Sequence, residues 1–299
     1  MITKPHLPRN PTVILAILSL VLVALGLQWG APSSQLTAFN GQRALLDVAY
    51  QVDLGPRIPG SLAQSNALAW MQRELESSGW TVETQRAERL GHALTNLVAR
   101  RGTGDEWILL GAHYDSRLLA DRDPDPEFAQ LPVPGANDGA SGVAVLLELA
   151  RVLPETLEKE IWLVFFDAED SGGLPGWDWI LGSRAFAEQL TSNPEAVIIV
   201  DMVGDVDLSL PIDGNSDPEL VAEIWSIAAQ LGYGDIFLNQ TKYYILDDHI
   251  PFLERGIPAV DIIDLEYEFW HTRADTTDKV SVHSLQVVGD TLLAWLLAE

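Results

Sequence analysis

Short apolar runs along the chain alternate with stretches in which apolar residues recur every three or four positions. The short runs cover residues 96–98, 107–110, 161–166, 197–200 and 259–263. Runs of this length between polar or turn-forming residues are typical of buried strands. The helical spacing falls within residues 142–153, 183–190, 218–231 and 281–297. This alternation predicts an α/β fold of three layers (α/β/α), in which helices cover both faces of a mostly parallel central sheet.

The rest of the pattern adds two helices and two long loops. One helix is expected before the Gly- and Pro-rich residues 55–60, and a second begins after a cap at Ser61 and stops at Gly79. The longest irregular segments, residues 117–137 and 171–181, contain Pro or Gly. Long loops in compact domains are often functional, so both are candidates for the active site.

The N-terminal segment has the pattern of a membrane anchor or an export signal. Lys4 and Arg9 precede an uncharged apolar run over residues 13–27, which is short for the roughly 20 residues that a membrane span needs. Residues 1–32 are therefore predicted to form a basic cytoplasmic flank and an uncleaved signal-anchor, with a cleaved signal peptide as the alternative. Residues 33–299 then form a single domain outside the cytoplasm, either anchored to the membrane or secreted or periplasmic.

Composition narrows the classes of partner and of metal ligand. Asp and Glu number 43 against 18 Lys and Arg, which gives a formal charge of −25. Such a charge repels phosphate backbones, so no nucleic-acid partner is expected. Contact with a membrane is expected through the N-terminal segment only. The chain has no cysteine, so any metal must be held by nitrogen and oxygen atoms. Composition leaves the oligomeric state open.

Side chains that can bind metals gather in loops, most of them directly after predicted strands. In chain order they are His113, Asp138, Asp167, Glu169, Asp170, Asp201, Asp247, Asp248, His249 and His271. Each one alone is also compatible with a helix cap, a turn or a hydrogen-bonded structural residue. The three carboxylates within residues 167–170, however, repel one another unless a cation or protons relieve the repulsion. Strand ends are where ligands bind in an open α/β sheet, so the set predicts a zinc site there.

These motifs resemble those of peptidase family twenty-eight, a family of zinc enzymes that includes secreted aminopeptidases and the related glutaminyl cyclases. The resemblance runs from about Gln42 to the C-terminus and rests on five ordered motifs. It implies that Asp138, Asp170 and His271 are the ligands of the main zinc ion, at the C-terminal ends of the strands. It also implies that Glu169, beside the zinc, is the general base and acid.

The same resemblance implies two versions of the site. In the aminopeptidases, His113 and Asp201 complete a second zinc site in which Asp138 bridges the two ions. The glutaminyl cyclases typically bind one zinc, and the counterparts of Asp201 and Asp247 join Glu169 in a hydrogen-bond network. One zinc ion is therefore the first expectation, and two are the alternative.

Local features favour the bacterial cyclase-like branch of this family. The segment 247–252 and the tryptophan immediately before His271 resemble cyclases, whose pocket is lined by aromatic side chains. The candidates for this lining are Trp177, Trp179, Phe269 and Trp270. Asp170 stands where Glu is more usual, although bacterial cyclase-like members are similar in having Asp. Residues 137–142, by contrast, are closer to the peptidase form.

The expected function is the cyclisation of an N-terminal glutamine of a peptide or protein to pyroglutamate, with release of ammonia. In that reaction zinc polarises the γ-carboxamide while Glu169 accepts a proton from the attacking α-amine. The alternative is an aminopeptidase that hydrolyses N-terminal residues with a water molecule activated by zinc. A membrane-anchored binding domain without catalysis is a third hypothesis. Such a domain would be expected to have lost metal ligands, but every ligand position holds a residue type that can bind zinc.

Overall fold

The computed structural model describes residues 38–298, and its central element is a six-stranded sheet of order β1-β2-β4-β3-β5-β8. The strands are β1 (Thr81–Arg89), β2 (His92–Arg101), β3 (Trp107–His113), β4 (Glu160–Phe166), β5 (Ala196–Asp201) and β8 (Ala259–Ile263). β4, β3, β5 and β8 pair in parallel, whereas β2 pairs antiparallel with both β1 and β4. The sheet is mostly parallel, as the sequence predicts.

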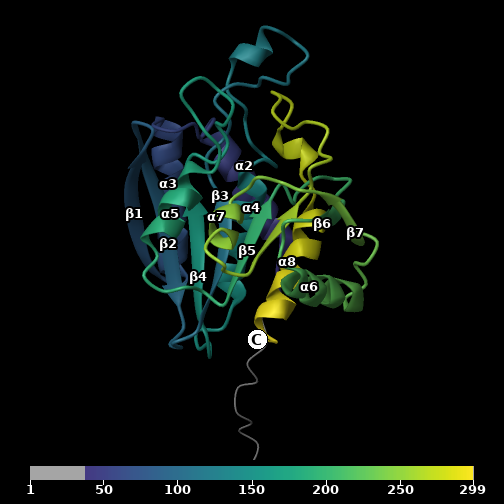
Figure 1. Ribbon diagram of the computed structural model, residues 1–299. Coiled ribbons are helices and arrows are strands. Elements are labelled where there is room, and N and C mark those ends of the chain that lie inside the picture. The colour runs from purple at the N-terminus through teal and green to yellow at the C-terminus, as the bar shows by residue number, and fades with distance from the viewer. Residues whose placement is uncertain (1–37, 299) are drawn as a thin grey trace, which may run out of the picture. The chain divides into compact units, whose positions relative to one another are not determined.

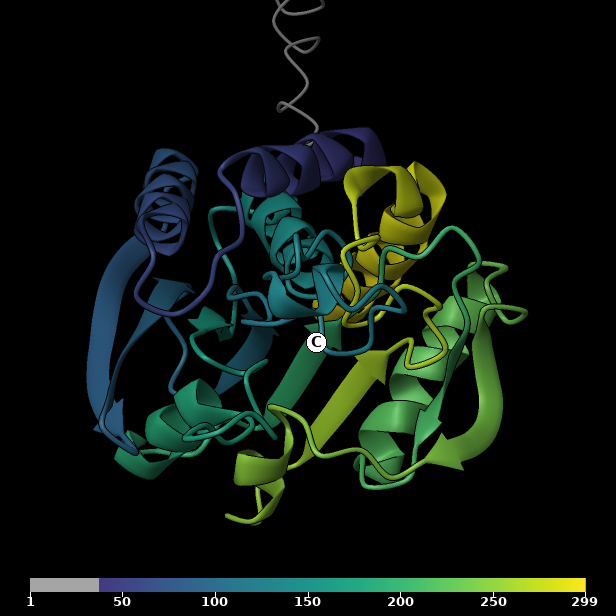
Figure 2. The ribbon, with the colours of Figure 1, turned by 90° about the horizontal axis from the view of Figure 1, so that it is seen from above.

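Helices cover both faces of this sheet (Figures 1 and 2). One layer contains α2 (Gly41–Asp53), α3 (Leu62–Ser77), α4 (Ala140–Val152), α6 (Pro218–Gln230) and α8 (Val282–Leu296), and the other contains α5 (Leu181–Gln189) and α7 (Ile250–Leu253). Successive residues of a strand face opposite layers. Leu110 of β3 belongs to the larger core with α4 and α8, and Leu109 belongs to the smaller core with Phe186 of α5. The predicted three-layer α/β/α architecture is confirmed.

Capping residues explain where two of the helices begin. The Ser61 hydroxyl accepts a hydrogen bond of 3.0 Å from the N–H of Gln64, so the predicted cap of α3 is confirmed. Asp138, which precedes α4, makes no such cap, because the N-cap position is Gly139 with a φ of 95°. A side chain there would meet the Asp115 carbonyl oxygen at 2.5 Å, so the turn needs glycine. The Asp138 carboxylate is thus left for another role.

Strands β1, β6 (Leu210–Asp213) and β7 (Phe237–Tyr243) are absent from the predicted set. β1 is an edge strand with largely exposed polar side chains, and β6 and β7 form a separate two-stranded parallel sheet. β2 is also longer than the predicted residues 96–98. Such strands are stabilised by backbone pairing at the edge of a sheet, which an apolar pattern does not reveal. Two short 3₁₀ turns, η1 (Phe128–Gln130) and η2 (Thr277–Lys279), complete the described elements.

The predicted anchor, residues 1–32, lies outside the described residues. Among residues 38–298, every helix is too short or too polar to cross a membrane. The described residues 38–298 all belong to one compact unit. The boundary between an N-terminal segment and a single domain of residues 33–299 stays a prediction.

Candidate active site and metal centre

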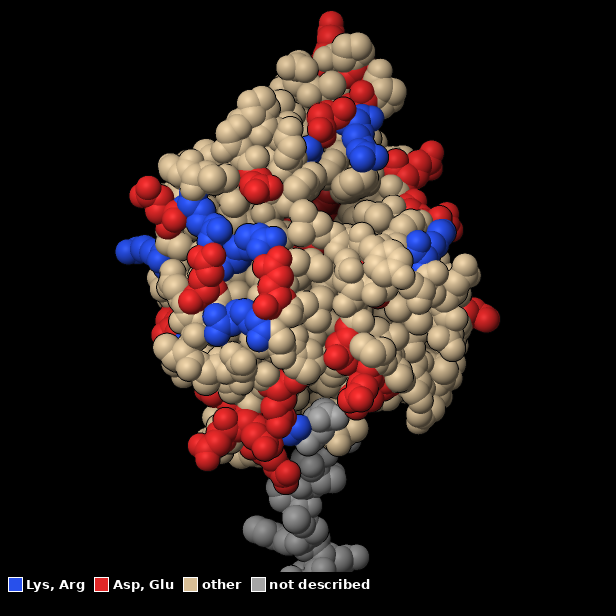
Figure 3. All heavy atoms as spheres, viewed as in Figure 1, with Lys and Arg blue, Asp and Glu red and all other residues tan. Residues whose placement is uncertain are grey.

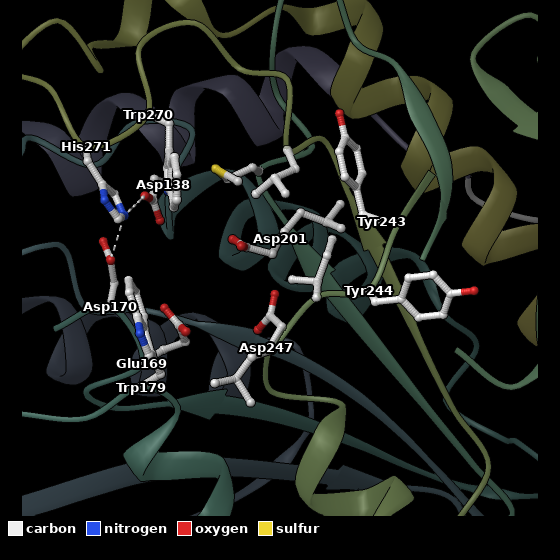
Figure 4. Close-up of a pocket in the computed structure, with 15 residues that line it drawn as sticks. Asp138, Glu169, Asp170, Trp179, Asp201, Tyr243, Tyr244, Asp247, Trp270 and His271 are labelled. Atoms are coloured by element: carbon white, nitrogen blue, oxygen red, sulfur yellow. Dashed lines mark ion pairs between the residues drawn. The ribbon is translucent and has the colours of Figure 1, made fainter. Parts of the chain in front are cut away.

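The C-terminal edge of the sheet carries a buried group of carboxylate and imidazole side chains (Figure 4). The positions are His113 at the end of β3, Asp138 before α4, Glu169 and Asp170 after β4, Asp201 at the end of β5, Asp247 before α7, and His271 in the loop after β8. None of them is more than 7% exposed. The fold therefore brings together every residue to which the resemblance assigns a metal-binding or catalytic role. Asp167 instead accepts hydrogen bonds from Gln64 and Thr95, and His249 lies 3.1 Å from Asp213.

Asp138, Asp170 and His271 each offer a ligand atom, and these atoms lie within 4.8 Å of one another. The Nε2 atom of His271 lies 3.0 Å from Oδ1 of Asp170 and 3.7 Å from Oδ2 of Asp138. Two ligands of a tetrahedral zinc ion with bonds near 2.1 Å are about 3.4 Å apart, so this trio fits such an ion. His271 Nε2 and the Oδ2 atoms of both aspartates are buried without a hydrogen-bond partner. A divalent cation would supply the missing partner for all three atoms.

A second trio shares Asp138 with the first. The Nε2 atom of His113 lies 3.0 Å from Oδ1 of Asp201 and 3.2 Å from Oδ1 of Asp138, and its Nδ1 atom lies 3.4 Å from Oδ1 of Asp115. Burial opposes protonation of His113, but the surrounding carboxylates outweigh burial and raise its pKa. The same geometry can therefore accept either a second cation or a protonated imidazole.

Two buried carboxylates hold the loops that carry the ligands, a role that the sequence analysis did not assign. Asp115 accepts hydrogen bonds from the backbone N–H groups of residues 169–170, at 3.1 and 3.2 Å. Asp275 accepts hydrogen bonds from the N–H groups of residues 137–138, at 2.8 and 3.2 Å. Both aspartates stand within motifs visible in the sequence, but these backbone contacts arise only when the loops fold against one another.

Left-handed backbone conformations coincide with the site. Ala168, Met202 and His271 have φ angles of 52°, 46° and 59°. For residues other than glycine, such conformations cost about 1 kcal/mol or more and persist only where the surroundings impose them. Ala168 precedes Glu169 and Met202 follows Asp201, so the packing fixes the backbone at the points where the functional side chains project.

A pocket of about 280 Å³ opens beside the candidate metal ligands. Figure 4 shows Trp179 and Trp270 on the side of His271, with Tyr243 and Tyr244 across the opening. Small-molecule sites commonly span about 300–1,000 Å³, so this pocket suits a single amino-acid residue. The two tyrosines come from the end of β7 and the loop after it, a region for which the sequence analysis predicted no element.

The predicted aromatic lining is only partly present. Trp179 and Trp270 line the pocket, but Trp177 and Phe269 lie outside its lining. Trp177 instead stacks on the His92 imidazole, with 3.5 Å between the ring centroids. Phe269 packs edge-on against Tyr267, with 5.6 Å between the centroids. The substrate-binding role predicted for Trp177 and Phe269 therefore has no geometric support here.

The crowded carboxylates are costly to ionise in the absence of a cation. Burial raises the pKa of Asp170 to about 6 and the pKa of Asp201 to about 7. Burial also raises the pKa of Glu169 well above its usual value. A divalent cation beside these groups would favour their ionised forms and so oppose the shifts.

We expect the metal-free protein to lose stability as the pH rises from about 5 to about 8. A carboxyl group with a raised pKa binds its proton more tightly in the folded state, so its contribution is complete below about pH 4 and is lost as the pH rises through its folded pKa. The Tm of chelator-treated protein should fall by roughly 5 °C or more over this range.

The zinc-loaded protein isolates the contribution of the site. Protonation of the ligands weakens metal binding, so the loaded protein should be at least as stable near pH 8 as near pH 5. Parallel thermal unfolding of both forms measures the difference. A metal-free Tm that rises with pH over this range would contradict the expectation.

Comparison with known proteins identifies the family. The model of Peptidase family M28 matches residues 96–296. The glutaminyl cyclase of Bacteroides thetaiotaomicron is 32% identical, with 89% of this chain and 100% of that chain covered and a TM-score of 0.84. A Zn-dependent exopeptidase from Parabacteroides distasonis is also 32% identical, with 88% and 100% covered and a TM-score of 0.80. The glutaminyl-peptide cyclotransferase of Bos taurus is 24% identical over 363 aligned positions, which cover 97% of this chain and 98% of the relative.

The family match spans all the candidate ligands, from His113 to His271. The two buried trios supply the nitrogen and oxygen donors that a zinc enzyme requires. These observations remove the hypothesis of a non-catalytic binding domain. The chain belongs to peptidase family M28 and is a zinc-dependent, glutaminyl cyclase-like enzyme.

Proposed function

We propose that this enzyme is a glutaminyl-peptide cyclotransferase, which converts the N-terminal glutamine of peptides or proteins to pyroglutamate. The observation that carries the proposal is the small pocket in which Trp179 and Trp270 lie beside Glu169 and the metal trio. In cyclisation both reacting groups belong to one residue, so a compact pocket can hold the whole reacting unit. Its similarity in structure to a bacterial glutaminyl cyclase supports the same function.

The side chains divide the chemistry between them. Asp138, Asp170 and His271 would hold a zinc ion, which supplies a Lewis acid for the carbonyl oxygen of the γ-carboxamide. Glu169 accepts a proton from the α-amine as the amine nitrogen bonds to the amide carbon. Glu169 then donates this proton to the departing nitrogen as the carbon–nitrogen bond of the carboxamide breaks, so that ammonia leaves.

The surroundings of Glu169 suit a group that holds a proton for a short time. Burial, together with the negative charge of Asp247, raises its pKa, so the protonated form is accessible. Asp201 and Asp247 line the same pocket as Glu169 (Figure 4). We assign them to a network that orients the Glu169 carboxylate toward the substrate amine.

The proposed site holds one zinc ion. A protonated His113, hydrogen-bonded to Asp201 at 3.0 Å and lying 3.2 Å from Asp138, would supply the positive charge that a second ion provides in an aminopeptidase. The raised pKa of His113 supports this arrangement. Two zinc ions, held with Asp138 as the bridge, belong to the alternative function.

The acidic surface suits a substrate with a free amino terminus. In Figure 3, acidic side chains spread over the visible face, whereas basic side chains gather in a few small groups. A protein of charge −25 attracts the α-ammonium group of a peptide. The basic and apolar N-terminal pattern supports a location outside the cytoplasm, either tethered to the membrane or released.

Two peptides that differ only in their first residue, Gln or Leu, test the proposal. We expect the Gln-led peptide to lose the mass of one ammonia and the Leu-led peptide to stay intact, because only glutamine carries a γ-carboxamide. Mass spectrometry of the products and the zinc content per chain are the measurements. Release of free amino acids by protein with two zinc ions per chain would replace the proposal with the aminopeptidase.

A further inference from the structure

The segment 117–123 lies between the two loops that carry the ligands Asp170 and His271. Its central contact is a two-bond ion pair, in which Nε and Nη2 of Arg117 donate to the carboxylate of Asp121 at 2.7 and 2.8 Å. Such a paired geometry fixes both side chains and is stronger than a single hydrogen bond. The Arg117 side chain is 3% exposed and the Asp121 side chain is 39% exposed, so the pair joins a buried guanidinium group to a carboxylate at the surface.

Arg117 holds one of the two ligand loops. Its Nη1 atom lies 3.3 Å from Oδ1 of Asp170 and donates to the carbonyl oxygen of Asp170 at 3.4 Å. Its Nη2 atom donates to the carbonyl oxygen of Gly172 at 3.2 Å. The guanidinium carbon lies 5.0 Å from the ring centroid of Trp179. Arg117 therefore contacts a ligand, the backbone after it and a wall of the pocket.

Asp121 faces the other ligand loop. Its Oδ1 atom lies 3.7 Å from Nδ1 of His271, which is within ion-pair range but longer than a hydrogen bond, and this ring nitrogen points away from Asp138 and Asp170. A histidine that binds zinc through one ring nitrogen almost always donates its other N–H to a carboxylate or carbonyl oxygen, which fixes the orientation of the ring. The next residue, Arg122, donates its backbone N–H to the carbonyl oxygen of His271 at 3.2 Å.

We propose that Arg117 and Asp121 form one positioning unit that couples the ligands Asp170 and His271, so that zinc affinity depends on the intact pair. Without the Asp121 carboxylate, the buried guanidinium would turn to Asp170 and compete with zinc for its oxygen. Without the planar guanidinium, Asp121 would lose the two bonds that hold it beside His271. The inference goes beyond the proposed cyclisation, because a cyclase and an aminopeptidase would share this metal site.

Zinc affinity of the purified full chain, measured by competition with a chromophoric chelator, tests the proposal. Arg117→Lys and Asp121→Asn should each weaken zinc binding by roughly 10- to 100-fold. The double variant should bind zinc about as tightly as whichever single variant binds it less tightly, because the two residues act as a unit. Asp125→Asn, two residues after this segment, and Arg184→Lys, in a surface ion pair with Glu254, are the matched controls and should leave the affinity unchanged.

A second readout separates positioning from simple stabilisation of the loop. The visible absorption bands of cobalt-loaded Asp121→Asn should shift relative to those of the wild type, because the orientation of the His271 ring changes. Unshifted bands would overturn the proposal. It would also be overturned if the metal-free variants had a lower Tm but bound zinc within about twofold of the wild-type affinity. These measurements report on the metal alone, so they stand whichever product the enzyme forms from peptides.

Discussion

Replacing Glu169 with glutamine is expected to lower kcat by roughly 10³-fold while zinc stays bound. The substitution keeps the size of the side chain but removes the group that accepts and returns the proton. Glu169 is outside both trios of candidate ligands, so the metal should be unaffected. Steady-state rates with a Gln-led peptide, together with the zinc content of the same sample, measure both parts of the prediction.

A matched substitution shows whether the loss is specific to the site. Glu188→Gln changes an exposed glutamate of α5 that pairs with Arg89, and it should leave kcat unchanged. Near-normal activity of Glu169→Gln would remove Glu169 from its catalytic role. Loss of zinc along with activity would instead make Glu169 a ligand.

Replacing Asp138 with asparagine should have an equally large effect through the metal. Asp138 belongs to both trios, so its loss weakens the site whether one zinc ion or two are bound. A neutral amide is a weaker zinc ligand than a carboxylate, so zinc affinity should fall by on the order of 100-fold or more, and activity should fall with it. Zinc retained after dialysis and the rate with a Gln-led peptide are the measurements.

Excess zinc separates the two causes of lost activity in this variant. If Asp138 acts only as a ligand, high zinc concentrations should restore part of the rate. The metal-free variant should still fold, because the hydrogen bond from the N–H of residue 138 to Asp275 does not involve the side chain. Full zinc occupancy in dialysed Asp138→Asn would contradict its role as a ligand.

The convergence of the candidate ligands could be anticipated because most of them stand in short motifs at the ends of strands, whereas the resemblance was needed to divide them into zinc ligands and a catalytic base. Glu169 and Asp170 follow an apolar strand, and Asp201 ends another. The carboxyl ends of parallel strands meet at one edge of a sheet, so residues distant in sequence converge there. The core strands and the longer helices were predictable for a related reason, because buried elements leave a clear apolar pattern.

The aromatic wall could not be assigned from sequence. Trp177 and Trp179 are two positions apart in an irregular segment, where no periodicity decides the direction of a side chain. The Trp179 ring lies against Gly172, at a distance that leaves no room for a Cβ atom, and this close approach sets its orientation. Trp177 turns instead toward His92, in a part of β2 that the apolar pattern missed.

The Arg117–Asp121 pair was hidden for a different reason. Oppositely charged residues four positions apart in a polar loop usually form a weak pair at the surface. Only the fold places that loop between the segments after β4 and β8.

The polar strands at the edges of the sheets could not be predicted from the apolar pattern, because their stabilising contacts are made by the backbone.

The three candidate ligands of the first trio lie far apart along the chain, at positions 138, 170 and 271. His271 reaches Asp138 and Asp170 only after β8 has joined β5 at the far edge of the sheet. Bringing such distant parts of a chain together costs loop-closure entropy, so a zinc ion held by all three side chains would stabilise the folded domain. A bound zinc ion would therefore cross-link the middle of the chain to its C-terminal part, a role that disulfide bonds play in other proteins and that a chain without cysteine cannot fill in that way.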